Sequence, residues 1–529
     1  MRFQPKPLAA AGLLALCSLA HAGEKVWISV GDAALKLLQK QKVVTPAASA
    51  SPMARLAGTD SSAATADRRA ENIHLVQVDE DDLLHLSAAV HRELKRCGGF
   101  MFHPSQAEGL ASLQRQAGTA KMAAVAALTR PSYTIAQQAV VPGLLSQMQA
   151  SNIGQTIVDL SAYVNRYYQT AGGVSASDWL KQRWTTLAGG RSDITVEQFT
   201  HASWKQKSVI ATIKGTDRPT EVVVIGAHLD SINQAGTTET TRAPGADDDA
   251  SGVASITEVL RTMVANGYKP RRTLKFMAYA AEEVGLRGSQ EIATSYANAG
   301  TNVVGVMQLD MTNYKGSVND IYLYTDYTDS AQNTFVSNLI KTYLPTLKVG
   351  TDKCGYGCSD HASWTAKGYY ASLPFEAAFN QDNPYIHTAN DTYANSGNQA
   401  DHSLKFARLA MAYMVELGSD GSTGIPDKTE TFSGSLTLNQ TRSFGPFKAG
   451  VGSFKASTTG TGDIDLYARR TSVPTTTTYD CKSDGSTSTE SCSINLTANG
   501  DVYVLLKGYR AGNYNLTVTY KAPAGLLTR

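Results

Sequence analysis

The chain has 529 residues, a length at which two to four folded units are expected. Its 48 Lys and Arg residues nearly balance its 46 Asp and Glu residues, and the formal net charge of +2 gives no reason to expect a nucleic-acid or membrane partner. Hydrophobic residues make up 42% of the chain, which is enough to build sizeable cores.

Residues 1–22 have the pattern of a secretory signal peptide. Arg2 and Lys6 precede an apolar run over residues 8–19, and Ala20-His21-Ala22 fits the small-x-small rule for cleavage. No later run reaches the roughly 18 apolar residues that a membrane-spanning helix requires. We therefore expect a secreted, extracellular protein.

Residues 23–130 differ in composition from the rest of the chain. They contain an Ala/Ser/Thr/Pro tract, an acidic patch and a helical pattern from Leu83 to Leu94. One interpretation is a small accessory domain; the one we favour is a prosegment that assists folding and covers the active site until it is removed. Cys97 and His103 are metal-type residues here, but a structural or free thiol beside a core histidine explains them more simply.

Residues 131–418 alternate between helical and strand patterns. This alternation is typical of an α/β sandwich with a mostly parallel central sheet flanked by helices. Apolar spacing and short β-rich runs predict helices at 157–168, 177–187, 250–265 and 284–297, and strands at 209–213, 222–227, 274–279, 303–309 and 321–324.

The last part of the chain is of a different type. Residues 419–428 contain Ser, Gly and Pro and are the predicted linker. Residues 429–529 are rich in Thr, Ser and Gly, with short alternating runs at 463–468, 502–507 and 514–520. We expect a small C-terminal all-β sandwich here.

Four cysteines fall into two pairs. Cys354 and Cys358 are four residues apart across a Gly-containing turn, close enough for a local disulfide. A metal knuckle is the alternative, but no second cysteine pair lies nearby to complete it. Cys481 and Cys492 both fall in the predicted sandwich and are placed to join a hairpin. In an exported protein we expect both pairs to be disulfides.

Five residues have the chemistry of metal ligands: His228, Asp248, Glu283, Asp310 and His387. Each follows a strand-like run or lies in a loop, and in open α/β sheets ligands bind beyond the carboxyl ends of the strands. Taken singly, each has a simpler explanation, such as helix capping or a solvated surface. Together, two histidines and three carboxylates exceed the ligands of one catalytic zinc and suit two zinc ions bridged by a carboxylate.

Six segments together resemble the secreted bacterial leucyl aminopeptidases, which are co-catalytic dizinc exopeptidases: HLDS, GADDDASG, AYAAEEVGLRGS, QLDMTNYKGS, CGYGCSDHASW and NPYIHTANDT. The resemblance runs from about Thr134 to Gly418. KVWISVG and RCGGFMFHPS resemble the prosegment of such enzymes. DLYARR, YDCKSD and YVLLKGY resemble the pre-peptidase C-terminal domain of secreted bacterial proteases.

The resemblance implies a role for each candidate ligand. Asp248 corresponds to the residue that bridges the two zinc ions. His228 and Asp310 would complete one zinc site, and Glu283 and His387 the other.

Glu282 and Tyr356 match positions of known importance in the family, and Asp230 is singled out by its place two residues after His228. Glu282 corresponds to the general base and acid, which takes a proton from the attacking water and delivers it to the leaving amine. Asp230 is placed to accept the second N–H of the His228 imidazole. Tyr356 corresponds to a tyrosine that helps to polarise the substrate carbonyl.

An apolar pocket for the first side chain of the substrate is also expected. Its walls would be Met311, Cys354, Cys358, Leu373, Phe375, Phe379 and Ile386. Asp382 departs from the family pattern, because an aromatic pocket residue is expected at its position.

The sequence thus predicts a monomeric secreted zymogen that releases hydrophobic residues, preferably leucine, from the N-termini of peptides and proteins. Its own prosegment is the expected inhibitor or folding aid. Within the same fold group, the alternatives are a carboxypeptidase and a glutaminyl cyclase with a single zinc. A non-catalytic surface-binding protein is a third possibility, but no ligand or acid/base residue is missing.

Overall fold

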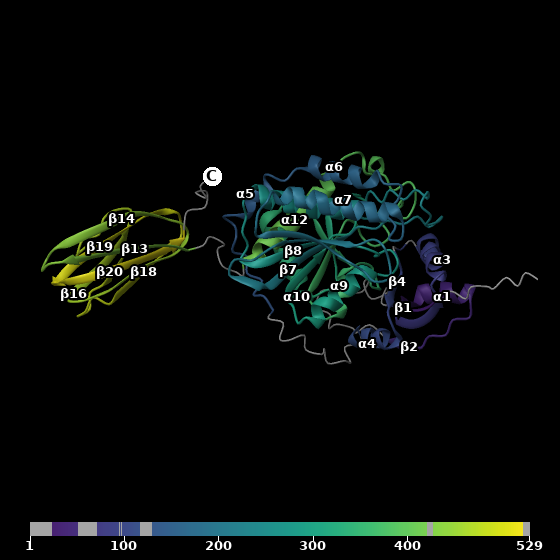
Figure 1. The fold of residues 1–529 in the computed structure, drawn as a ribbon, viewed down its shortest axis with the longest axis horizontal. Coiled ribbons are helices and arrows are strands. Elements are labelled where there is room, and N and C mark those ends of the chain that lie inside the picture. Colours follow the sequence, from purple (N-terminus) through teal and green to yellow (C-terminus); the bar gives the residue numbers. More distant parts are fainter. Residues whose placement is uncertain are drawn as a thin grey trace, which may run out of the picture.

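The structure of the chain, a computed structural model, describes residues 24–50, 71–94, 96, 98–116, 130–419 and 427–521. The predicted signal peptide and Cys97 lie outside these residues. The described parts form an N-terminal sheet, a central sheet flanked by helices, and two C-terminal sheets (Figure 1). None of the described helices combines the length and the hydrophobicity needed to cross a bilayer.

The N-terminal sheet is antiparallel, in the order β2-β3-β1-β4, and its apolar face is covered by short helices. The predicted helix at 83–94 is split into α3 and a π-helical turn, η2. His103 is buried, and its Nε2 lies 2.9 Å from the Ser29 hydroxyl, which is a structural role. The elements are β1 (Lys25–Gly31), α1 (Asp32–Gln41), β2 (Ala48–Ala50), β3 (Ile73–Asp79), α3 (Asp82–Ala89), η2 (Val90–Leu94), β4 (Phe100–His103) and α4 (Gln106–Gln116).

The central sheet has eight strands in the order β11-β10-β12-β9-β7-β8-β6-β5. It is mixed: β12, β9, β7 and β8 run parallel in its middle, and the antiparallel pairs lie towards its edges. The strands are β5 (Ile194–Phe199), β6 (Ser208–Ile213), β7 (Arg218–His228), β8 (Arg272–Tyr279), β9 (Asn302–Gln308), β10 (Ile321–Tyr324), β11 (Val349–Asp352) and β12 (Ala371–Phe375).

Helices cover both faces of this sheet. Because side chains alternate along a strand, Val223 and Ile225 of β7 join the larger core with α8 and α12, whereas Val222 and Val224 join a second core with α9 and α11. The α/β fold class is therefore confirmed. The helices are α5 (Val141–Leu145), α6 (Ala150–Ser161), α7 (Ala171–Ala188), α8 (Ala250–Ala265), α9 (Arg287–Asn298), α10 (Ser330–Tyr343), α11 (His361–Ala366), η3 (Tyr393–Ser396) and α12 (Asp401–Gly418).

One predicted helix is misplaced. The apolar spacing predicted a helix at 157–168, but α6 begins at Ala150 and ends at Ser161. The following loop carries Arg166, which is fully buried and donates hydrogen bonds to the carbonyls of Leu229 and Gly245, at 2.8 and 2.9 Å. These tertiary bonds outweigh the local helical preference.

The C-terminal part is an all-β sandwich, as predicted. Its two antiparallel sheets have the orders β13-β20-β15-β18 and β14-β19-β16-β17 and enclose one apolar core. A disulfide joins Cys481 to Cys492. The strands are β13 (Asp427–Leu436), β14 (Thr441–Ala449), β15 (Gly452–Gly460), β16 (Asp463–Arg470), β17 (Cys481–Ser483), β18 (Glu490–Leu496), β19 (Gly500–Arg510) and β20 (Gly512–Lys521).

Candidate metal centre and substrate pocket

The central sheet brings the five predicted ligands to one edge. Since β7 pairs in parallel with β8 and β9, the carboxyl ends of these three strands meet there. His228 ends β7, while Glu283 and Asp310 follow β8 and β9 directly. Asp248 precedes α8, and His387 lies in the loop after β12. All five side chains are buried.

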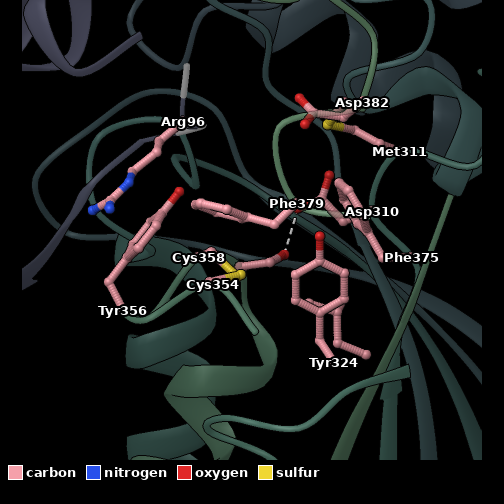
Figure 2. A pocket seen from close by; sticks show the side chains of 12 residues that line it. Arg96, Asp310, Met311, Tyr324, Cys354, Tyr356, Cys358, Phe375, Phe379 and Asp382 are labelled. Atoms are coloured by element: carbon pink, nitrogen blue, oxygen red, sulfur yellow. Dashed lines mark hydrogen bonds between the residues drawn. A yellow bond between two sulfur atoms is a disulfide. The ribbon is translucent and has the colours of Figure 1, made fainter. Parts of the chain in front are cut away.

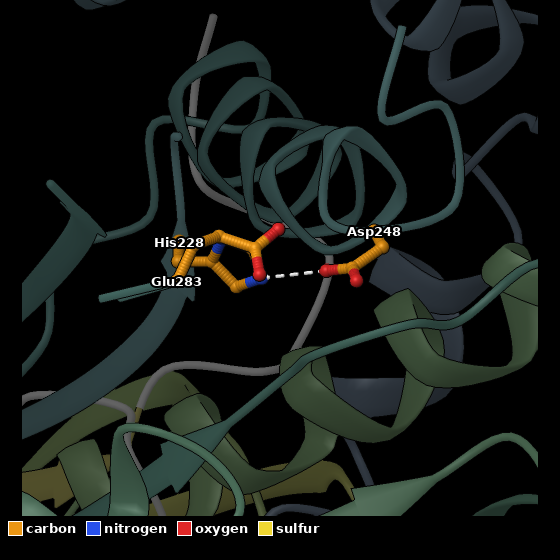
Figure 3. A group of neighbouring side chains, drawn as sticks. All are labelled: His228, Asp248 and Glu283. Atoms are coloured by element: carbon orange, nitrogen blue, oxygen red, sulfur yellow. Dashed lines mark hydrogen bonds and ion pairs between the residues drawn. The ribbon is translucent and has the colours of Figure 1, made fainter. Parts of the chain in front are cut away.

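Asp248 lies between two pairs of candidate ligands. Its Oδ1 is 2.8 Å from His228 Nε2, and its Oδ2 is 3.0 Å from His387 Nε2. His228 Nε2 is 3.5 Å from Asp310 Oδ1, and His387 Nε2 is 2.8 Å from Glu283 Oε2. Figure 3 shows how His228, Asp248 and Glu283 face one another. Each oxygen of Asp248 therefore faces one histidine–carboxylate pair.

The donor set fits metal ions. Imidazole nitrogens and carboxylate oxygens are the ligands that zinc takes in catalytic sites. The ligand atoms of His228, Asp248 and Glu283 all lie within 4.8 Å of one another. Oε1 of Glu283 and Oδ1 of Asp310 are buried and have no hydrogen-bond partner among the described residues. A bound cation would satisfy both oxygens.

Asp249 also lies near His228 and Asp310, but its carboxylate is occupied. It caps α8 by accepting the Gly252 N–H at 2.8 Å. It also accepts the backbone N–H groups of His228 and Met311, at 2.9 and 3.1 Å. Asp249 therefore joins three of the segments that carry the ligands and is a support rather than a ligand.

Asp230 contacts both the His228 imidazole and the glutamate pair. The Nδ1 of His228 lies 3.1 Å from the backbone carbonyl oxygen of Asp230 and 3.6 Å from its carboxylate. The carboxylate also accepts the backbone N–H groups of Glu282 and Glu283, at 3.0 and 3.1 Å. The reason is the parallel register, which sets the loop after β8 beside the loop after β7. Asp230 thus positions the glutamate pair with its side chain and the imidazole with its backbone.

Two further contacts hold the ligand loops. Asp391 accepts the backbone N–H groups of Asp247 and Asp248, each at 3.1 Å. Gln234 Nε2 lies 2.9 Å from His387 Nδ1 and holds the ring whose other nitrogen faces the cluster. With a metal on Nε2, the Nδ1–H would donate to the amide oxygen of Gln234 after a flip of the amide. His387 has φ 57°, in the left-handed region, and this strained backbone is typical of functional sites.

Negative charge accumulates in the cluster. Burial, with Asp248 nearby, raises the pKa of Glu283 to about 7, and burial beside Asp247 raises the pKa of Asp391 to about 8. Burial also opposes ionisation of Asp248, but its hydrogen bonds to His228 and His387 outweigh that effect and hold its pKa below the usual range. Bound cations would stabilise such a group of buried carboxylates.

Glu282 stands beside the cluster with its side chain available. It is 5% exposed, and its carboxylate makes no hydrogen bond to a described residue. Burial raises its pKa well above the usual range for glutamate. A carboxylate with these properties is suited to accept a proton from a water molecule and to release it again.

A pocket opens next to the cluster (Figure 2). Six of the seven predicted pocket residues line it, whereas Ile386 is buried and lies outside the lining. Tyr356 and Asp382, the residue that departs from the family pattern, also line the pocket. The lining consists of Arg96, Asp310, Met311, Tyr324, Cys354, Tyr356, Cys358, Ser359, Leu373, Phe375, Phe379 and Asp382.

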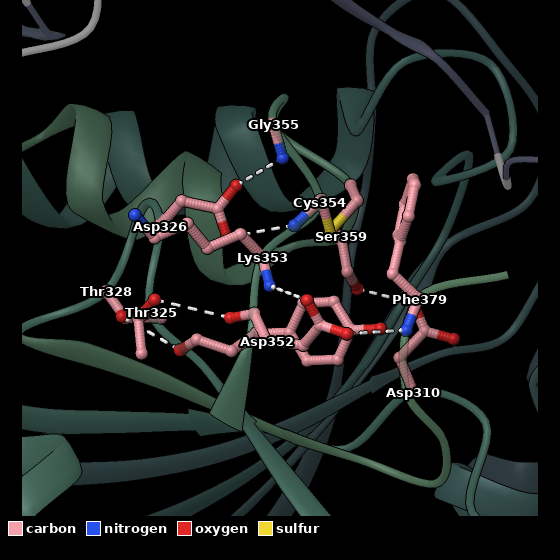
Figure 4. The surroundings of a disulfide bond; sticks show 12 residues. Asp310, Thr325, Asp326, Thr328, Asp352, Lys353, Cys354, Gly355, Ser359 and Phe379 are labelled. Carbon is pink, nitrogen blue, oxygen red and sulfur yellow. Dashed lines mark hydrogen bonds between the residues drawn. A yellow bond between two sulfur atoms is a disulfide. The ribbon is translucent and has the colours of Figure 1, made fainter. Parts of the chain in front are cut away.

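A disulfide between Cys354 and Cys358 closes one wall of the pocket (Figure 4). Asp326 accepts the backbone N–H groups of Cys354 and Gly355, at 3.1 and 2.6 Å. These bonds anchor the cysteine loop to the segment after β10. The loop then leads to Ser359, whose hydroxyl donates to Asp310.

The N-terminal unit lies over the site. The His91 ring is 5.5 Å from the His387 ring, measured between centroids. The guanidinium of Arg96 lies over the rings of Phe379 and Tyr356, 5.5 and 5.8 Å from their centroids. The Phe102 N–H also donates to the Gly285 carbonyl, at 3.1 Å.

Several contributors to the site had no signal in the sequence. Arg96 belongs to a segment far from the ligands in the chain, and Gln234 and Ser359 are ordinary polar residues in loops. Asp391 follows His387 by four residues, but only the fold shows that it is buried against Asp247. Nothing in residue spacing identifies such partners.

Comparison with known protein families gives two matches. Residues 208–414 match peptidase family M28, and residues 447–508 match the bacterial pre-peptidase C-terminal domain. The first match contains all five candidate ligands. The second lies within the C-terminal sandwich.

Individual proteins agree with these matches. Leucine aminopeptidase 1 of Fusarium vanettenii is 37% identical over 296 residues, which are 53% of this chain and 74% of the relative. The probable aminopeptidase YDR415C of Saccharomyces cerevisiae is 33% identical over 306 residues, covering 55% of this chain and 80% of the relative. The crystal structure of the Legionella pneumophila LapA aminopeptidase superposes with a TM-score of 0.59 and 29% identity, covering 75% of this chain and 99% of that one.

Proposed function

The chain belongs to peptidase family M28 and is a metal-dependent aminopeptidase, and we propose that it is a secreted dizinc enzyme that releases hydrophobic residues, preferably leucine, from peptide N-termini. The observation that carries the dizinc proposal is the position of Asp248, whose two oxygens face His228 with Asp310 and His387 with Glu283. Residues 1–22 would direct secretion. We propose that the enzyme acts as a monomer.

The fit of the donor set supports the proposed division of residues between the two metals. His228 and Asp310 would hold one zinc, Glu283 and His387 the other, and Asp248 would bridge them. When bound, the zinc ions would supply Lewis-acid polarisation of the scissile carbonyl and acidify the attacking water.

The remaining residues would transfer protons and orient the reacting groups. The Glu282 carboxylate takes the proton of the attacking water and passes it to the leaving amine. Asp230 holds the Glu282 backbone, so the carboxylate keeps its place during both transfers. Tyr356, in the pocket wall, donates a hydrogen bond to the substrate carbonyl.

The proposed preference for hydrophobic residues rests on the pocket. Its walls carry Met311, Leu373, Phe375 and Phe379, which together form an apolar surface next to Asp310. A leucine side chain would bury its apolar area there at about 25 cal/mol per Å². The α-amino group would lie beside the carboxylates of the cluster, which favours a chain terminus over an internal peptide bond.

Glu282→Ala tests the reaction. We expect wild type to hydrolyse leucine-p-nitroanilide, and the variant to keep its zinc while losing at least about 100-fold in kcat, since general acid–base catalysis contributes on this scale. Turnover and zinc content are measured on the same samples. If the variant loses metal, Glu282 is a ligand and the assignment is wrong. If wild type with full zinc is inactive on leucine-p-nitroanilide but cyclises an N-terminal glutamine, the aminopeptidase reaction is wrong.

The N-terminal unit would inhibit this activity as a prosegment. His91, Arg96 and Phe102 contact the ligand loop, the pocket wall and the segment after Glu283 respectively. Substrate would have to displace these contacts in order to place its N-terminus against the cluster. Cleavage after about Arg130 would therefore activate the enzyme.

A further inference from the structure

Asp382 is a carboxylate in a pocket whose other walls are largely apolar. It lies in the loop between β12 and His387, and it lines the pocket with Met311, Phe375 and Phe379 (Figure 2). The family resemblance implies an aromatic residue at this position. An acidic residue therefore stands in a pocket with largely apolar walls.

The backbone on both sides of Asp382 is anchored. The Gln381 side chain accepts a hydrogen bond from Ser317 at 2.7 Å, and the Asn383 amide donates to Asp247 at 3.0 Å. Phe379 is held through its N–H by Asp352, also at 3.0 Å. The Asp382 carboxylate therefore lies on a loop that these hydrogen bonds hold in place.

The carboxylate has no cationic partner. Among the described residues, no side chain forms an ion pair with Asp382 or donates a hydrogen bond to it. Arg96 also lines the pocket, but its guanidinium pairs with Glu71. Burial raises the pKa of Asp382 to about 6, which still leaves it ionised at neutral pH. Asp382 is half-buried, so its charge is only partly solvated, and a ligand cation would stabilise it.

We propose that Asp382 is a specificity-determining residue that extends the substrate range to peptides beginning with lysine or arginine. The aliphatic stem of such a residue would lie against Met311, Phe375 and Phe379, and its cationic end would pair with the Asp382 carboxylate. This inference rests on the proposed aminopeptidase function and adds a cationic substrate class to it.

The test compares lysine with norleucine, whose side chain has the same unbranched stem without the ammonium group. The kcat/KM values for the p-nitroanilides of lysine, norleucine and leucine are measured for wild type, Asp382→Asn and Asp382→Glu. We expect Asp382→Asn to lower the lysine-to-norleucine ratio by at least about tenfold and Asp382→Glu to restore most of it. The leucine-to-norleucine ratio should stay the same, because neither side chain carries a cation.

Exposed Asp401, outside the pocket lining, provides the matched control, because Asp401→Asn changes the net charge equally. Thermal unfolding and zinc content check that each variant is folded. An unchanged ratio in Asp382→Asn would overturn the proposal. An equal loss for all three substrates would overturn it as well, because Asp382 would then serve the α-ammonium group. If wild type does not hydrolyse leucine-p-nitroanilide, the aminopeptidase function itself is contradicted. If wild type hydrolyses leucine-p-nitroanilide but not lysine-p-nitroanilide, only this inference is contradicted.

Discussion

At the scale of single residues, adjacent aspartates have different tasks because their side chains leave the backbone in different directions. Asp247 accepts the Asn313 N–H at 2.9 Å, Asp248 faces both histidines, and Asp249 caps α8. Composition alone describes only an acidic run. Hydrogen bonds from backbone N–H groups separate the supports from the ligand.

His402, in the first turn of α12, is expected to make the stability of the fold depend on pH. Burial lowers its pKa to about 4 from the ordinary value of 6.5. Between these values the unfolded chain binds a proton that the folded chain excludes, so stability is lost as the pH falls from about 6.5 towards 4, at about 1.4 kcal/mol per pH unit.

When the pH falls from 7 to 5, we expect the free energy of unfolding to drop by about 2 kcal/mol less in His402→Gln than in wild type. Urea unfolding at the two pH values measures this difference. Exposed His85→Gln is the control and should behave as wild type. An identical pH dependence in His402→Gln would contradict the assignment.

At the scale of elements, strands were predicted better than helices. The runs at 222–227, 274–279 and 303–309 lie in or within a residue of β7, β8 and β9, because buried parallel strands are continuous apolar segments. The predicted ligands follow these strands, and the parallel register then gathers them. The structure places all five in one cluster, although their roles as ligands stay a prediction.

The misplaced helix at this scale has a physical cause. The helix predicted at 157–168 is displaced by tertiary hydrogen bonds that Arg166 donates to the carbonyls of Leu229 and Gly245. These bonds depend on loops that meet only in the folded chain. The sequence carries no local signal for such meetings.

At the scale of the whole molecule, the N-terminal unit and the site face each other. Glu80 pairs with Arg287 at 2.7 Å, and the Ser87 carbonyl accepts from Gln234 at 3.5 Å, so the contacts reach beyond His91 and Arg96.

We expect cleavage after Arg130 and removal of the N-terminal part to raise kcat/KM for leucine-p-nitroanilide at least about tenfold, because a covered site is competent only in its open fraction.

The same measurement on full-length Arg96→Ala should show part of this gain, whereas exposed Arg92→Ala should show none. Cleavage within 419–428 is predicted to leave the rate unchanged, since none of the described residues of the C-terminal sandwich belongs to the cluster or to the lining of the pocket. Equal rates before and after removal of the N-terminal part would contradict inhibition.

Zinc content per chain, measured in wild type and in three ligand variants, tests the central claim most directly. We predict two zinc ions in wild type, fewer than one in Asp248→Ala, and about one in both Glu283→Ala and Asp310→Ala, because Asp248 faces both histidine–carboxylate pairs and each of the other two carboxylates faces one histidine. Asp401→Asn, which removes an exposed carboxylate that is not one of the candidate ligands, should retain two. A single zinc in wild type, or two in Asp248→Ala, would contradict the account.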